Sequence, residues 1–322
     1  MPRLPLVLAL TALVATITAV ALPAGATPPG TNGKLVFERP TRQGPNLFTV
    51  AADGSGLTQL TRLRGGEGDS SWSPDGSKVA FARATRDRGP FEIWVVNADG
   101  SGLVRLTRHR GFSIAPAWSP DGRKIVYATD AGKRRRLELH VMDSDGSGDQ
   151  RIASNRTRDY SDPSWSPDGA TIAFAILRSG ESPRDFDSSI ALVDADDGSN
   201  LRRLTQRGGP DELKPNWSPN GAAIAFERTR LFAVRQSDIW LMNADGSGKR
   251  RITATRAYET NPAFSPDGTR IAFTSDRDNR RLSKERLGRG FELYTMGLDG
   301  RGIVRVTANR RPDLFPDWQP LP

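Results

Sequence analysis

Apolar residues recur along the chain in short runs that are bounded by polar, turn-forming residues. One kind of run ends in an aromatic residue, as in Val79-Ala-Phe81 and Ile271-Ala-Phe273, and a second kind follows later, as in Ile93-Trp-Val-Val96. The runs are rich in β-branched and aromatic residues, and they are apolar throughout rather than alternating with polar residues. This pattern predicts short β-strands that neighbouring sheets cover on both faces.

A five-residue motif precedes each run of the first kind. Trp-Ser-Pro-Asp-Gly occurs at 72–76, 118–122 and 165–169, with variants at 217–221 and 264–268 and a shortened copy at 318–320. The aromatic residues are separated by 46, 47, 52, 47 and 54 residues. Pro fixes φ for a type I turn, Asp suits the next position, and Gly takes the left-handed conformation that closes a hairpin. Later Asp-Gly pairs predict a second hairpin in each repeat.

Each repeat therefore predicts four antiparallel strands, and the repeats number six. The segment Lys34–Phe37 is a second strand without an inner strand before it, whereas Trp318 has no second strand after it. Pairing of these two ends completes one blade and leaves no open sheet edge. The predicted fold is an all-β, six-bladed β-propeller of four-stranded antiparallel blades, closed by pairing of the N- and C-terminal strands.

The first 26 residues differ from the repeat region. A short basic start, an apolar stretch and Ala24-Gly25-Ala26 predict a signal peptide over residues 1–26, which leaves the propeller domain at 27–322. The alternative is an uncleaved membrane anchor. We expect export, to a secreted, periplasmic or cell-wall-associated location, and no membrane span after cleavage. The formal net charge of +9 becomes +8 when Arg3 is removed.

The chain has no Cys, so disulfides and thiolate metal sites are excluded. Only two histidines are present, His109 and His140. His140 takes the place of Trp94 and Trp240 in other repeats, which predicts a packing role. His109 lies between Arg108 and Arg110 and is expected to be exposed and without a partner.

The order of Trp-Ser-Pro-Asp-Gly, Ile-Ala-Phe, Asn-Ala-Asp-Gly and Arg-Leu-Thr resembles the repeat of the TolB-type, WD-repeat-like propeller family. The resemblance covers about residues 32–320 and implies a six-bladed propeller. TolB itself carries an α/β domain before its propeller, and we expect this exported chain to lack that domain. Related peptidases carry a hydrolase domain and a Gly-x-Ser-x-Gly elbow, which this sequence does not contain.

The predicted topology places the two hairpins of each blade on one face of the disc, the hairpin face. The loops between blades and between second and third strands lie on the opposite, variable-loop face, where binding usually resides. Carboxylates in the connections to the inner strands form a candidate ligand or cation site at the channel mouth: Glu67, Asp69, Asp159, Asp162, Asp211, Glu212, Glu259 and Asp313. Such a ring could hold Ca²⁺. The alternative is pairing with neighbouring Arg64, Arg158, Lys214 and Arg256. No cofactor is otherwise expected.

Basic loops on the same face form a candidate anion-binding rim, the basic rim, which comprises Lys133, Arg134, Arg135, Arg136, Arg280 and Arg281. The partner classes that fit an exported basic protein are another protein or an anionic cell-envelope polymer, rather than nucleic acid. The alternative is a solvated basic surface. We expect a monomer.

Two functions are consistent with the sequence. The first is a non-enzymatic, exported binding or scaffold propeller that holds its ligand or partner on the variable-loop face. The alternative is a cation-dependent hydrolase or lyase that acts on an extracellular polymer at the channel mouth. No pair of carboxylates has a spacing that identifies catalysis, so no catalytic residue is predicted.

Overall fold

The computed structural model describes residues 30–84, 89–109, 111–131, 136–178, 187–230, 234–278 and 290–322. Every regular element in these segments is a β-strand. Accordingly, the described residues contain no helix with the length and apolar character needed to cross a membrane.

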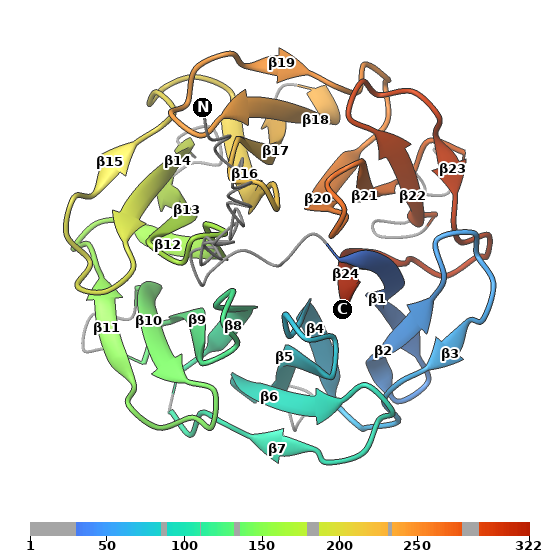
Figure 1. The fold of residues 1–322 in the computed structure, drawn as a ribbon, viewed down its shortest axis with the longest axis horizontal. Coiled ribbons are helices and arrows are strands. Elements are labelled where there is room, and N and C mark those ends of the chain that lie inside the picture. Colours follow the sequence, from blue (N-terminus) through green and yellow to red (C-terminus); the bar gives the residue numbers. More distant parts are fainter. Residues whose placement is uncertain are drawn as a thin grey trace, which may run out of the picture.

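The described strands form six four-stranded antiparallel sheets around a central axis (Figure 1). Blade 1 consists of β24 (Leu314–Leu321), β1 (Thr31–Thr41), β2 (Gly44–Val50) and β3 (Thr58–Gln59). Blade 2 consists of β4 (Gly66–Trp72), β5 (Lys78–Ala84), β6 (Phe91–Asn97) and β7 (Val104–Arg105). Blade 3 consists of β8 (Ser113–Trp118), β9 (Lys124–Thr129), β10 (Glu138–Asp143) and β11 (Gln150–Ala153).

The other three blades follow the same order from the axis outward. Blade 4 consists of β12 (Asp159–Trp165), β13 (Thr171–Arg178), β14 (Asp187–Asp194) and β15 (Arg202–Arg203). Blade 5 consists of β16 (Asp211–Trp217), β17 (Ala223–Arg230), β18 (Val234–Asn243) and β19 (Arg250–Arg251). Blade 6 consists of β20 (Glu259–Phe264), β21 (Arg270–Ser275), β22 (Glu292–Gly297) and β23 (Val304–Arg305). The prediction of six four-stranded blades is confirmed.

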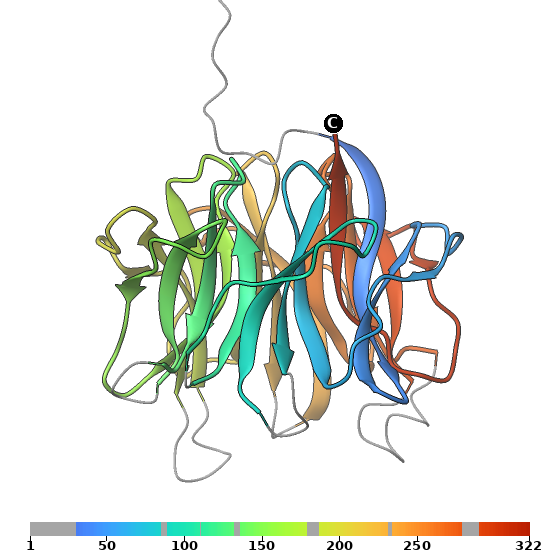
Figure 2. The same ribbon diagram turned by 90° about the horizontal axis from the view of Figure 1, so that it is seen from below.

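The ring closes in blade 1, as the sequence predicts. Strand β1 pairs antiparallel with β24, with Leu35 opposite Trp318 and Thr31 opposite Leu321. The two strands lie side by side in both views, and the chain ends at the hairpin face (Figures 1 and 2). Trp318 is 3% exposed and packs with Leu35 and Phe37. The first and last described strands are therefore tied into one sheet.

The hairpin motif works through its serine as well as its proline and glycine. The Ser73 hydroxyl donates to Asp75 at 2.6 Å and accepts a bond from the Lys78 amide at 2.9 Å. Gly76 has a φ of 67°, the left-handed conformation expected of it. In the variant motif, Ser218 donates to Asn220 in the same way, at 2.8 Å. The turn thus fixes the start of each second strand.

The threonine of the Leu-Thr motif holds the outermost strand to the third strand. The Thr107 hydroxyl accepts a bond from the Ile93 amide at 2.9 Å. The same contact recurs at Thr61, Thr205, Thr253 and Thr307. An outer strand of two residues makes few backbone hydrogen bonds to the third strand. The bond from the threonine hydroxyl adds to them and helps to hold the short strand in place.

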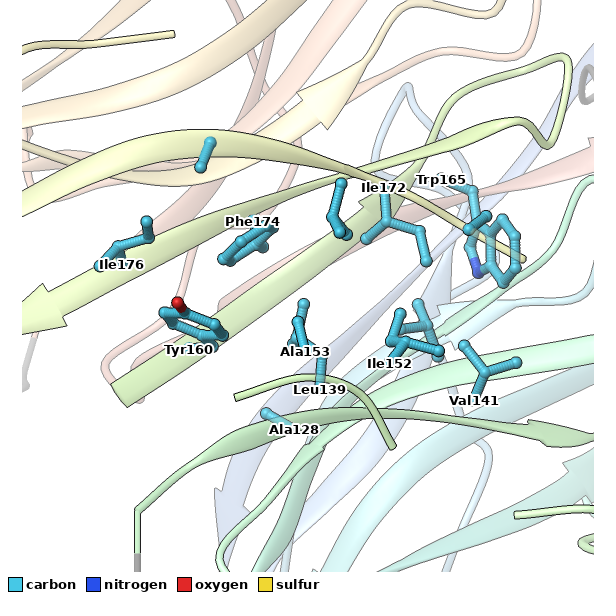
Figure 3. Close-up of a cluster of buried hydrophobic side chains, with 14 residues drawn as sticks. Ala128, Leu139, Val141, Ile152, Ala153, Tyr160, Trp165, Ile172, Phe174 and Ile176 are labelled. Atoms are coloured by element: carbon cyan, nitrogen blue, oxygen red, sulfur yellow. The ribbon is translucent and has the colours of Figure 1, made fainter. Parts of the chain in front are cut away.

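The hydrophobic core lies between blades rather than within them. Between blades 3 and 4, Leu139 and Val141 of one sheet pack against Trp165, Ile172 and Phe174 of the next (Figure 3). Equivalent clusters occupy the other five interfaces between neighbouring blades. Strands covered on both faces explain why the apolar runs in the sequence are continuous.

Candidate functional site

All six inner strands carry a bulge at the same place, three residues before the aromatic residue of the turn motif. In β4 the pairing register shifts between Gly68 and Ser71, and Asp69 has a φ of 51°. The equivalent residues also have positive φ, and we call the set the channel ring: Asp69, Ala115, Asp162, Lys214, Asn261 and Phe315. A left-handed conformation costs a non-glycine residue about 1–2 kcal/mol. Its recurrence in six blades shows that the repeat imposes it.

The channel ring lines a pocket of about 150 Å³ to which all six inner strands contribute. A second axial pocket, of about 130 Å³, lies at the level of the aromatic residues and the turn prolines, toward the hairpin face. The ring pocket is therefore the one nearer the variable-loop face. One backbone geometry repeated six times thus places six different side chains at one level of the channel.

Lys214 is the cation of the channel ring. Its Nζ lies 2.7 Å from Asp162 Oδ1 of the preceding blade and 5.1 Å from the centre of the Phe315 ring. Burial disfavours its charge, but Asp162 and Asp69 outweigh this and raise the pKa of Lys214 above its usual value. The lysine therefore stays charged and links the ring across blades.

Two glutamates approach the channel ring from second strands. Glu38 and Glu227 occupy a position that is alanine or threonine in the other four blades. Glu38 lies against Gly68, where an added Cβ would be only 2.4 Å from Glu38 Oε2. Glu227 accepts a hydrogen bond from Thr260. Sequence reasoning missed both residues, although their departure from the repeat was a visible signal.

Burial dominates the electrostatics of these acids. Burial, followed by the charge of Asp69, raises the pKa of Glu38 to about 8. Burial also raises the pKa of Asp69 and of Glu227. Glu38 is therefore mainly protonated at neutral pH, and a cation that entered the ring would favour its ionised form.

The eight carboxylates predicted at the channel mouth do not form one ring. Asp69 and Asp162 belong to the channel ring, and both line the pocket. The others lie near the start of their own inner strands, and five of them have a basic partner in the pairs Glu67–Arg83, Asp159–Arg136, Glu212–Arg228, Glu259–Arg277 and Asp313–Arg39. Asp211 accepts a bond from Ser188 at 3.4 Å.

The basic partners differ from those that sequence proximity suggested. Glu67 lies directly opposite Arg83 across the β4–β5 ladder, and Glu212 lies opposite Arg228 in blade 5. Lys214 pairs with Asp162, whereas Arg158 lies 3.7 Å from Asp187. Cross-strand register decides the pairs of Glu67 and Glu212, whereas Lys214 reaches Asp162 across a blade interface. Within the described residues, no group of three or more histidine or acidic side chains is placed to hold a metal ion.

Most of the predicted basic rim lies outside the described residues, namely Lys133, Arg134, Arg135, Arg280 and Arg281. Arg136 is described, and its Nη1 donates to Asp159 Oδ2 at 3.0 Å. This arginine, next to β10 of blade 3, is therefore engaged with a carboxylate of the neighbouring blade 4.

Both histidines meet at Asp149, so the expectation that His109 lacks a partner is wrong. His109 Nε2 lies 3.1 Å from the Tyr127 hydroxyl, which donates to Asp149 Oδ1 at 2.7 Å. His140 Nδ1 lies 3.1 Å from the same oxygen. The signal was available in the sequence, because Asp149 replaces an apolar residue such as Leu57 or Leu103 at that point of the repeat.

Comparison with known proteins agrees with this geometry. The family described as "TolB beta propeller domain" matches residues 105–230 and 213–281, which together exceed half of the chain. A TolB homolog of Chlorobium luteolum is 38% identical over 65 residues, which are 20% of this chain and 14% of that protein. The chain thus matches only a small part of that relative's length.

Two solved structures share the fold. TolB from Acinetobacter baumannii has a TM-score of 0.72 at 20% identity, over 89% of this chain and 67% of that chain. A putative TolB from Agrobacterium tumefaciens has a TM-score of 0.64 at 20% identity, over 90% of this chain and 92% of that chain. At such identities the likeness concerns the fold alone. With its family match and its six repeated blades, the chain belongs to the TolB β-propeller domain family.

Proposed function

We propose that the protein is an exported, non-enzymatic binding propeller whose channel receives a cationic side chain of a partner protein from the variable-loop face. The observation that supports this is the set of acids near the ring pocket: among the described residues, Asp69, Asp162 and Glu227, together with Glu38 when it ionises, interact with Lys214, the cation of the channel ring. The chain as a whole has a net charge of +9, so the channel is an acidic exception within a basic protein.

Export rests on the sequence of residues 1–26, which precede the described residues. Anionic cell-envelope polymers remain a predicted second class of partner through the basic rim. The two surfaces act separately in this proposal, because the ring attracts cations and the rim attracts anions.

The test is calorimetric titration of the mature protein with a decalysine peptide at low and moderate salt. The double variant Asp69→Asn with Asp162→Asn is expected to lose at least about tenfold in affinity, since it removes two direct carboxylate contacts. Affinity for the unmodified protein should rise between pH 6 and pH 9, because cation binding competes with the proton on Glu38.

The matched control is Asp53→Asn with Asp196→Asn, which makes the same charge change at exposed hairpin positions. This control should bind decalysine as the unmodified protein does. Equal loss of affinity in the two double variants would show that only net charge matters, and it would remove the channel from the proposal.

A further inference from the structure

A cavity of about 360 Å³ opens in blade 5, larger than either axial pocket. Its wall includes Pro210, Arg228, Gln236, Asp238, Trp240 and Arg251. None of these residues lines the channel pockets. Its volume falls at the small end of the range for ligand sites, which suits a ligand of monosaccharide size.

The origin of the space is clear when the blades are compared. In blades 2, 3 and 6 a glutamate on the third strand reaches an arginine on the outer strand, in the pairs Glu92–Arg105, Glu138–Arg151 and Glu292–Arg305. Blade 5 has the pair Asp238–Arg251 at 2.7 Å instead. The aspartate side chain is one methylene shorter than glutamate, and Arg251 still pairs with it. The space that the longer glutamate side chain takes up in the other blades is therefore left empty.

Asp238 has an oxygen that lacks a donor. The residue is 8% exposed, and its Oδ2 accepts bonds from Arg251 at 2.7 Å and from Gln236 at 3.4 Å. Oδ1 is buried and has no hydrogen-bond partner among the described residues. A buried acceptor without a donor is costly, so this oxygen calls for a hydrogen-bond donor from whatever fills the cavity.

The surrounding charges decide what kind of donor fits. Glu212 lies 3.6 Å from Arg228 and 3.9 Å from Lys249, and Asp238 pairs with Arg251. Among the described residues, the wall itself carries two cations, Arg228 and Arg251, and one anion, Asp238. An ammonium group is therefore disfavoured, whereas a carboxylate can pair with the arginines and a neutral hydroxyl can donate to Asp238.

The apolar part of the wall fits a sugar ring. The Arg228 guanidinium lies over the Trp240 ring at 4.5 Å, so the two planar groups form one stacked part of the wall. Pro210 adds a second apolar contact. Ligand sites typically combine such surfaces with a few polar groups that fix orientation.

We propose that the blade 5 cavity is a binding site for a sugar acid. The ring hydroxyls donate to Asp238 Oδ1, the carboxylate pairs with Arg228 and Arg251, and the apolar face of the sugar packs on Pro210 beside the Arg228–Trp240 stack. No covalent step is involved. This site goes beyond the proposed channel function and is independent of it.

The test is ligand-observed NMR and calorimetry on the mature protein with four probes: glucuronate, glucose, acetate and glucosamine. Glucuronate combines the carboxylate with hydroxyls, and each of the others lacks one feature or carries the disfavoured charge. Glucuronate is expected to bind at least about tenfold more tightly than any of the other three. If glucose bound with comparable affinity, the protein would not recognise the carboxylate of glucuronate, and the proposal would be overturned.

Variants locate the site. Asp238→Glu restores the residue of blades 2, 3 and 6 and fills the cavity, so it should abolish glucuronate binding while the melting temperature stays unchanged. The matched control is Glu92→Asp in blade 2, where Arg83 and Trp94 repeat the stacking at 4.8 Å; it should leave glucuronate binding by blade 5 intact. Asp69→Asn with Asp162→Asn should also leave it intact, which separates this site from the channel.

Two results would refute the sugar-acid site. One is the absence of saturable glucuronate binding at tens of millimolar, which would leave a cavity that holds water only. The other is unchanged binding in Asp238→Glu, which would place the ligand elsewhere.

Discussion

The backbone amide of Trp72 donates a hydrogen bond to the carboxylate of Asp317, at 2.7 Å and 245 residues away in sequence. Asp317 belongs to the closing strand β24 and Trp72 to the inner strand of the next blade. Two further blades use the same contact with other acceptors: Asn216 accepts from Phe264 at 2.8 Å, and Ser164 accepts from Trp217 at 3.3 Å. Side chains around the channel thus join neighbouring blades directly.

The Asp317 contact predicts a specific pH dependence. Burial raises the pKa of Asp317 to about 6 from a usual value near 3.8. Because the folded pKa is raised, the stabilising contribution of the protonated form is complete below about pH 4 and is lost as pH rises through 6. Asp317→Asn keeps an acceptor for Trp72 without the charge. Its melting temperature should exceed that of the unmodified protein above pH 6 and match it near pH 4. A variant that is less stable only at high pH would show that the charge itself stabilises the ring.

The contact between Glu38 and Gly68 predicts a steric defect that can be rescued. Gly68→Ala would place a Cβ 2.4 Å from Glu38 Oε2, so it should cost about 1–3 kcal/mol in the free energy of unfolding. Gly66→Ala, in the same strand, meets only Phe91 at 3.4 Å and should have a smaller effect. Adding Glu38→Ala to Gly68→Ala should recover most of the loss in a double-mutant cycle. Additive effects in denaturant titrations would contradict this contact.

Closure of blade 1 predicts that the last strand is essential. Deletion of Leu314–Pro322 removes the partner of β1 and exposes two strand edges and the apolar surface packed around Trp318. Burial of one large side chain is worth about 2–3 kcal/mol, so the truncated protein should melt much earlier or aggregate. Trp318→Phe is the mild control, because Phe264 fills the equivalent place in blade 6. An unchanged calorimetric melting curve for the deletion would mean that the ring does not depend on this pairing.

Export predicts the start of the mature chain. Cleavage after Ala26 should give protein that begins at Thr27 outside the cytoplasm, as N-terminal sequencing or mass spectrometry can establish. Substitution of Ala24 and Ala26 by bulky residues should block this processing. Recovery of an intact Met1 form confined to the membrane would support the anchor instead.

The repeat in the sequence predicts the number of blades, the turns and the place of closure, because these depend on local chemistry that recurs in each copy. Trp-Ser-Pro-Asp-Gly specifies its hairpin wherever it occurs. Counting the strands of each repeat also shows that the predicted strand at Lys34–Phe37 has no inner strand before it, which predicts where the ring closes. The contacts of the channel could not be read in this way. Lys214 and Asp162 meet across a blade interface, and Glu38 reaches Gly68 of the neighbouring blade, so their meeting depends on how sheets are placed around the axis.

Departures from the repeat were the useful signal that sequence reasoning did not exploit. Glu38 and Glu227 replace alanine or threonine, Asp149 replaces an apolar residue, and Asp238 replaces a glutamate. Each substitution marks a feature that the other blades lack: a glutamate near the channel ring, the contact of two histidines with Asp149, or the blade 5 cavity. By contrast, the six channel-mouth carboxylates outside the ring occupy related positions in several blades. Four of them pair with an arginine of their own blade, whereas Asp159 and Asp211 bond to residues of the preceding blade.

The pairing of Thr31 with Leu321 has a mechanical consequence. The chain enters β1 and leaves β24 at the same face, so tension applied at these two points pulls the strands apart from one end. The backbone bonds of this pair are then loaded one after another, as in a zipper, rather than together as in shear. Blade 1 is therefore the place where the ring yields first under load, even though its core is as well buried as that of the other blades.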